Sequence, residues 1–163
     1  MFVGNYSIEF NIQTNVQTMR IFFTTRRILA NARHVTHLAL HGTYKLTWNG
    51  FPVLMIGSTD CMRHYHPFGL ALTTGETKDD YTFLCRSLQL SIEKVGLPPF
   101  HPTCLLADGA EAITNGFESV FGPAEKRIMC WAHVVRNVDK NMVGIPAHDK
   151  KRLDNFIFNI FWH

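Results

Sequence analysis

The first half of the chain contains short runs of apolar and alternating residues that are typical of strands. From Val35 to His41 apolar residues partly alternate with polar ones, which predicts a half-buried strand that ends at Gly42. The Asn49-Gly50 pair predicts a hairpin turn, and the apolar run from Phe51 to Gly57 predicts a strand buried on both faces. Phe68 to Thr73 predicts another strand. Together these segments predict an antiparallel meander of three strands.

After Gly75 the apolar positions follow a helical period. Positions 81, 84, 88, 92 and 95 are apolar, Thr77 and Asp80 have the spacing of a capping box, and Gly96 provides a stop, so we expect a helix between them. Strands over 103–107 and 126–130 then alternate with helices over 110–120, 131–142 and from 149 to about 160. This order predicts an α/β fold with a mixed sheet, in which the later strands are parallel to the first and helices cover both faces. It suits an RNase H-like core.

Two strand ends of this sheet carry candidate functional residues. In open sheets with parallel strands, functional groups lie beyond the carboxyl ends of neighbouring strands. The first predicted strand ends at His41 and the fourth at Asp108, so we expect these residues to mark the site. Asp108 has a second interpretation, because an Asp just before the helix that begins near Ala110 can act as its cap.

Composition narrows the class of protein. The chain has 163 residues, 46% apolar and 18% charged, which predicts one ordinary core and excludes a disordered tail. Its longest apolar stretches are too short to span a membrane, and no basic segment precedes an apolar core at the start, so an intracellular location is expected. The four Cys are unclustered and are interpreted as reduced thiols. A net charge of +3 is compatible with a polyanionic partner but does not identify one.

A series of motifs between about Val35 and Met142 resembles a known family. The motifs are His41-Gly42-Thr43-Tyr44-Lys45, Asn49-Gly50-Phe51-Pro52, His66-Pro67, Gly75-Glu76-Thr77-Lys78-Asp79-Asp80-Tyr81, Leu105-Leu106-Ala107-Asp108-Gly109 and Cys130-Trp131-Ala132-His133. In this order they resemble the transposase domain of Mutator-like elements (MULE). We therefore assign residues 35–163 to an RNase H-like MULE transposase core, expected to be truncated at its C-terminal end, and residues 1–34 to an N-terminal flanking segment.

The resemblance implies a nuclease and strand transferase of the DDE type, in which three acidic residues hold two divalent metals, Mg²⁺ or Mn²⁺. Asp108 matches the second acid, as a catalytic residue and metal ligand. His41 occupies the place of the first Asp, and a neutral imidazole is a poorer ligand for these hard cations than a carboxylate. The third acid of the family is a Glu, and no Glu follows Glu125 in this chain. Impaired catalysis is therefore expected. His41 either caps the edge of the strand or binds a softer metal beside Asp108.

Other motif residues carry two interpretations each. Glu76 matches a family position, but a carboxylate at a helix entry is also favoured by the exposed amides there. Cys130 and His133 match the family's Cys-x-x-His and could also be a buried Cys and a helix His, because zinc needs about four ligands. The His64-Tyr65-His66 segment is interpreted as a solvated turn rather than a metal clip.

DNA is the partner that the resemblance implies, with Lys45, Arg136 and Lys140 as candidate contacts to phosphates. No motif that reads base edges is present, so sequence-specific binding is not predicted. A DNA partner implies a nuclear or otherwise intracellular location. A homo-oligomer is a possible form of the chain, and no membrane association is expected. The alternatives are a domesticated DNA-binding or protein-interaction module without enzymatic activity, and a decayed fragment that is unstable or obligately oligomeric.

Overall fold

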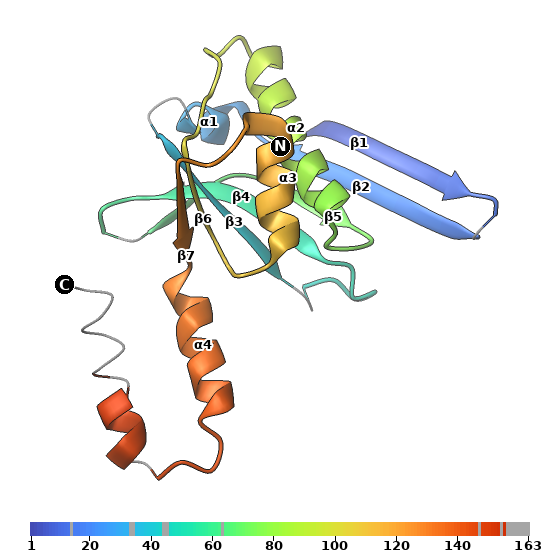
Figure 1. Cartoon of the computed structure of the whole chain (residues 1–163). Helices are drawn as coiled ribbons and strands as arrows, with labels where there is room; N and C mark the ends of the chain where they lie inside the picture. The colour runs from blue at the N-terminus through green and yellow to red at the C-terminus, as the bar shows by residue number, and fades with distance from the viewer. Residues whose placement is uncertain are drawn as a thin grey trace. The chain divides into compact units, whose positions relative to one another are not determined.

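The structure is a computed structural model of the whole chain, and it describes residues 1–13, 15–32, 35–43, 46–62, 64–146, 148–153 and 155. The chain divides into two compact units, Met1–Met129 and Cys130–His163. The first unit contains the sheet and the second contains the last described helices (Figure 1).

The first unit is built on a mixed sheet with the strand order β1-β2-β5-β4-β3-β6-β7. Its strands are β1 (Phe2–Asn11), β2 (Val16–Thr24), β3 (His37–Thr43), β4 (Val53–Thr59), β5 (Tyr65–Thr73), β6 (Cys104–Ala107) and β7 (Lys126–Met129). Three helices of this unit connect them, namely α1 (Arg26–Leu29), α2 (Lys78–Lys94) and α3 (Glu111–Phe121). This architecture confirms the predicted α/β class with a mixed sheet.

The central strands form the predicted antiparallel meander. β3 pairs antiparallel with β4, and β4 pairs antiparallel with β5. In the turn that ends before β4, the Gly50 amide donates to the Thr47 carbonyl and Gly50 has a φ of 71°, a left-handed conformation that favours glycine. β3 and β4 each begin and end two residues later than predicted, and β5 begins at Tyr65 instead of Phe68. The earlier start of β5 allows its polar residues to pair with the end of β4.

The later elements follow the predicted alternation of helix and strand. β6 pairs parallel with β3, and β7 pairs parallel with β6. At the start of α2 the Asp80 carboxylate accepts hydrogen bonds from the Thr77 amide and the Thr77 hydroxyl, both at 2.8 Å, which confirms the cap. Gly96, with a φ of 73°, lies just past the end of this helix.

One face of the sheet holds the hydrophobic core. α1, α2 and α3 all contribute side chains to a single buried cluster, in which Leu40, Ile56 and Phe22 come from the sheet. α2 and α3 cross closely at Gly116, where an added Cβ would lie 2.5 Å from Tyr81 Cβ. The strand register directs His41, Met55 and neighbouring residues to the opposite face. These three helices therefore do not provide the expected cover of the second face.

The sequence reasoning assigned no elements to the N-terminal residues, and the structure forms a long hairpin there. β1 and β2 pair antiparallel, and β2 joins the edge of the meander by pairing with β5 over Arg20–Phe23. Figure 1 shows this hairpin, in blue, projecting past the rest of the sheet. It is attached to α2 through hydrogen bonds from Asn5 to Ser87 and from Arg20 to Asp80.

The second unit begins with α4 (Trp131–Asn141), close to the predicted bounds of 131–142. Residues 148–153 are also helical, where the last helix was predicted to begin at 149. Positions 156–160 of that prediction lie outside the described residues.

Candidate functional site

The two predicted site residues lie at neighbouring places in the sheet. β3 and β6 pair in parallel with Ala39 opposite Leu106. His41 and Asp108 are each two residues further along, so the same register brings them opposite one another on the face that the core leaves open. Both residues are partly exposed. The prediction that these two strand ends meet is thus consistent with the observed strand pairing, whereas their chemical roles stay predictions.

Asp108 also organises the turn that leads into α3. Its Oδ1 accepts a hydrogen bond of 2.9 Å from the amide of Ala110, the residue that caps α3. This is a local turn two residues before the helix begins, close to the alternative interpretation of Asp108 as a cap. A turn of this kind is compatible with either role, so it does not decide between them.

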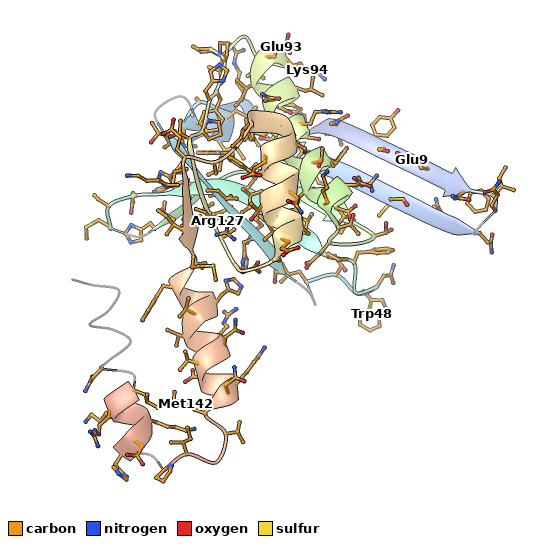
Figure 2. The ribbon with its side chains drawn as sticks, in the orientation of Figure 1. Glu9, Trp48, Glu93, Lys94, Arg127 and Met142 are labelled. Carbon is orange, nitrogen blue, oxygen red and sulfur yellow. The ribbon has the colours of Figure 1, made fainter. Side chains whose placement is uncertain are left out.

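Arg127 on β7 braces the end of β6, and the sequence reasoning did not identify it. Its Nη1 donates to the carbonyls of Ala107 (3.2 Å) and Ile128 (2.7 Å), and its Nη2 donates to the carbonyl of Asp108. Its Nε donates to Thr114 Oγ1 on α3 at 3.1 Å, and Figure 2 shows the residue on β7 beside that helix. Burial lowers the pKa of the Arg127 guanidinium, and the nearby charge of Asp108 partly opposes this effect. The guanidinium therefore fixes the backbone that carries Asp108.

Glu76 approaches the same end of β3 from the core side. An added Cβ at Gly42 would lie 2.5 Å from Glu76 Oε1 and 2.9 Å from the Tyr81 hydroxyl, so a larger residue there would displace the ends of these two side chains. Glu76 Oε1 is buried and has no hydrogen-bond partner among the described residues. Gly42 follows His41 directly, and its position against Glu76 places that carboxylate on the face opposite to the His41 side chain. Glu76 thus lies behind the strand end and not on the open face.

The remaining motif residues belong to the second unit or lie outside the described residues. Cys130 caps α4, and the amide of His133 donates to the Cys130 carbonyl at 3.0 Å. Arg136 and Lys140 are exposed and four residues apart on α4, so they lie on one side of this helix. Lys45 lies outside the described residues. The structure therefore describes two of the three residues that are predicted to contact DNA.

The turn between β4 and β5 contains a carboxylate held by two histidines. Asp60 Oδ2 lies 2.9 Å from His66 Nε2 and 3.3 Å from His64 Nδ1, and Asp60 Oδ1 accepts from the His64 amide at 2.8 Å. The hydrogen bond from His66, followed by that from the His64 amide, lowers the Asp60 pKa to about 2. The His64 side chain is 73% exposed and the His66 side chain 49%. The predicted solvated turn is therefore only partly found, because Tyr65 and His66 are the first two residues of β5, and Asp60 orders the shorter turn before them.

The sequence of the chain was compared with models of known protein families. A model of the MULE transposase domain matches residues 37–137, which is more than half of the chain. The chain belongs to the MULE transposase domain family. No curated protein and no solved structure gives a match. The match begins at the first residue of β3 and ends within α4, so it includes His41, Asp108, Cys130 and His133 of this MULE domain.

The MULE family is generally dependent on divalent metals, but the described donors of this MULE domain do not fit a two-metal site. Such a site needs several carboxylate oxygens that converge from different elements. Here Asp108 supplies one carboxylate and His41 an imidazole. Among the residues that the structure describes, no group of three or more His, Cys, Asp or Glu side chains could hold a metal ion.

No described helix of the MULE domain is long and apolar enough to cross a membrane.

Proposed function

We propose that this MULE domain is derived from the DNA cleavage and strand-transfer machinery of transposition, binds DNA, and is impaired in cleavage. The observation that carries the proposal is the pair formed by His41 and Asp108 at adjacent strand ends. Two hard cations that activate phosphodiester oxygens need carboxylates at such positions, and one of the two is an imidazole here. The fold thus supports descent from a DNA-cleaving enzyme, whereas the pair of donors at His41 and Asp108 disfavours cleavage by this domain.

DNA contact is proposed through basic side chains of α4. Arg136 and Lys140 are exposed on one side of this helix, where they could reach successive phosphates. Lys45 is a third candidate contact. Contacts of this kind are independent of sequence and weaken with salt, which agrees with the lack of a base-reading motif. A nuclear location would follow from this partner and is part of the same proposal.

A second candidate function is a domesticated module that binds DNA or protein and has no enzymatic activity. It rests on the same observation, because the replacement at His41 removes a ligand charge without removing the strand that carries it. The two candidates differ in whether any cleavage remains. A cleavage assay and a binding assay therefore separate them.

Cleavage is tested by nicking of supercoiled plasmid with Mg²⁺ or Mn²⁺. We expect the chain and its Asp108→Ala variant to give the same background, because the described donors do not form a two-metal site. Asp79→Ala is the matched control, since it removes an exposed carboxylate from the first turn of α2. Cleavage that Asp108→Ala abolishes and Asp79→Ala retains would overturn the proposed impairment. His41→Asp is expected to stay inactive, because no Glu follows Glu125 within these 163 residues to act as the third acid.

Binding is tested by fluorescence anisotropy with duplex DNA over a series of salt concentrations. The slope of log K against log salt should fall by about 2 in the Arg136→Gln/Lys140→Gln double variant, because two phosphate contacts are lost. Arg86→Gln/Lys94→Gln removes the same charge from exposed positions of α2 and should leave the slope unchanged. Lack of binding at low salt, or an equal fall of the slope in both double variants, would contradict the proposed contacts.

A further inference from the structure

β1 presents an open edge of the sheet. It is the first strand in the order, and among the described residues no strand pairs with it on the side away from β2. Proteins usually protect such an edge with Lys, Pro, a short strand or a bulge. β1 has ten residues, contains neither Lys nor Pro, and has its one irregularity near the start, between Val3 and Asn5. From Asn5 to Asn11 the pairing of β1 with β2 is regular, and on β1 itself the Tyr6 amide donates to Asn5 Oδ1 at 2.9 Å.

The outer half of the hairpin also lacks support from the sheet. β2 pairs with β5 only over Arg20–Phe23, whereas β1 and β2 continue to pair as far as Asn11 and Val16. An isolated two-stranded ribbon is marginally stable in water. Hydrogen bonds between Met19 and Thr74 extend this support by one residue, and beyond them the described hairpin is held by the pairing of β1 with β2.

Apolar side chains follow one face of this edge strand. Tyr6, Ile8 and Phe10 alternate with polar residues and are 69%, 57% and 59% exposed. Ile21 and Met19 lie opposite Tyr6 and Ile8 on β2, so the apolar surface continues into the sheet. This alternation is typical of a strand with one buried face, yet the described helices of this unit pack on the other side.

We propose that β1 pairs antiparallel with β1 of a second copy of this chain, so that two sheets join into one across a two-fold axis. A two-fold contact is made by the same surface on both copies, and an edge strand that pairs with itself meets this condition. The proposal does not rest on the proposed function in DNA binding. The proposed contact is made by β1, which is one edge strand of the sheet, whereas β7 is the other edge strand.

The side chains select one register for this pairing. With Ile8 opposite Ile8 of the second copy, Tyr6 faces Phe10 on both sides of the axis and the apolar residues share one face. Glu9 then faces Ser7 of the second copy. A shift of two residues one way sets Glu9 opposite Glu9, and a shift the other way sets Phe10 opposite Gly4. The first of these brings like charges together and the second loses an aromatic contact, so the symmetric register is favoured.

A cross-link tests the register directly. Ile8→Cys in a Cys61→Ser background removes the exposed native thiol and places two new thiols opposite each other at the axis. Mild oxidation should give a covalent dimer on a non-reducing gel. Glu9→Cys in the same background is the matched control, because its side chain points to the other face and lies opposite Ser7, so no disulfide should form and the chain should run at the mass of one copy on this gel. Equal cross-linking of both variants would overturn the register.

Sedimentation analysis tests the dimer itself. The unchanged chain should sediment at twice its mass of 18.7 kDa. Ile8→Lys brings two charges together at the axis and should weaken association at least about 30-fold, the effect of losing a central interface residue. Trp48→Lys, at a fully exposed turn, should leave it unchanged. Circular dichroism confirms that the variants fold. A monomer at high concentration, or a dimer insensitive to Ile8→Lys, would overturn the proposal.

Discussion

A buried ion pair holds the N-terminal hairpin against α2. Arg20 Nε on β2 donates to Asp80 Oδ1 at 2.7 Å, and the two side chains are 13% and 3% exposed. Asp80 Oδ2 accepts two further hydrogen bonds from Thr77, so this carboxylate caps α2 and binds the hairpin at once. Loss of the pair should therefore weaken two elements together.

The perturbation that isolates this pair is Asp80→Asn, which keeps the shape of the side chain and removes its charge. Removing one partner of a buried pair leaves the other charge uncompensated and costs about 3–5 kcal/mol. Small domains have a free energy of unfolding of only about 5–15 kcal/mol, so this is a large part of the total. Arg20→Met should cost less than Asp80→Asn, because the carboxylate would keep its two hydrogen bonds from Thr77. The double variant should lose less than the sum of the two, since neither charge is then left alone.

Urea denaturation of the unchanged chain, the two single variants and the double variant gives the loss of unfolding free energy in each variant. Hydrogen exchange of the hairpin amides shows whether the hairpin itself is weakened. Glu9→Gln is an internal control, because Glu9 Oε1 lies 3.8 Å from Arg20 Nη1 but is 70% exposed (Figure 2). Such an exposed pair contributes about 1 kcal/mol at most. A loss below about 1 kcal/mol in Asp80→Asn, or strictly additive single variants, would refute the view that this pair joins the hairpin to α2.

Three further predictions concern packing, titration and reactivity. Gly116→Ala should lower the free energy of unfolding, measured in urea, by about 1–3 kcal/mol, because the new Cβ would meet Tyr81. This loss should outweigh the higher helix propensity of Ala. An unchanged free energy would contradict the close crossing of α2 and α3. The Asp60 carboxyl should titrate near pH 2 by NMR and move toward 3.8 in His66→Gln. Its stabilising contribution is then present above about pH 3.8 and lost as the pH falls toward 2, and an unshifted midpoint would argue against the turn. Burial raises the Cys85 pKa, so iodoacetamide should alkylate Cys85 only after unfolding, whereas the exposed Cys61 should react in the folded protein. Labelling of Cys85 in the folded protein would contradict its burial.

The fold was predictable wherever a single period dominates the sequence. The helical stripe that ends at Gly96 and the apolar run of β4 are such segments, and both elements are found. The N-terminal hairpin was missed although Tyr6, Ile8 and Phe10 alternate as in a strand. Gly4 and Asn5 interrupt this alternation where the register shifts, because Gly4 lies close to Phe22 and Ser91 while Asn5 bonds to Ser87 on α2. That interruption depends on tertiary packing, which the local pattern does not contain.

The candidate site was predictable in its strand ends but not in its supports. His41 and Asp108 could be paired from sequence, because the carboxyl ends of parallel strands meet at one edge. Arg127 could not, since its hydrogen bonds reach carbonyls about twenty residues earlier and depend on the register of β6 with β7. The close approach at Gly42 is similar, because it involves Glu76, which precedes α2, and Tyr81 on α2.

The strand order separates the proposed dimer edge from the candidate site. β1 is one edge of the sheet, and β2, β5 and β4 lie between it and the strands β3 and β6 that carry His41 and Asp108. Pairing through β1 would therefore leave these strand ends open. The hydrogen bonds from Arg127 and the turn at Ala110 hold the backbone at Asp108 without using the His41 side chain. Under the proposed function, the chemistry at position 41 is thus separable from this backbone support, so that loss of cleavage is compatible with folding, pairing and DNA binding. Ile8→Lys should accordingly change association without changing the salt dependence of DNA binding per chain.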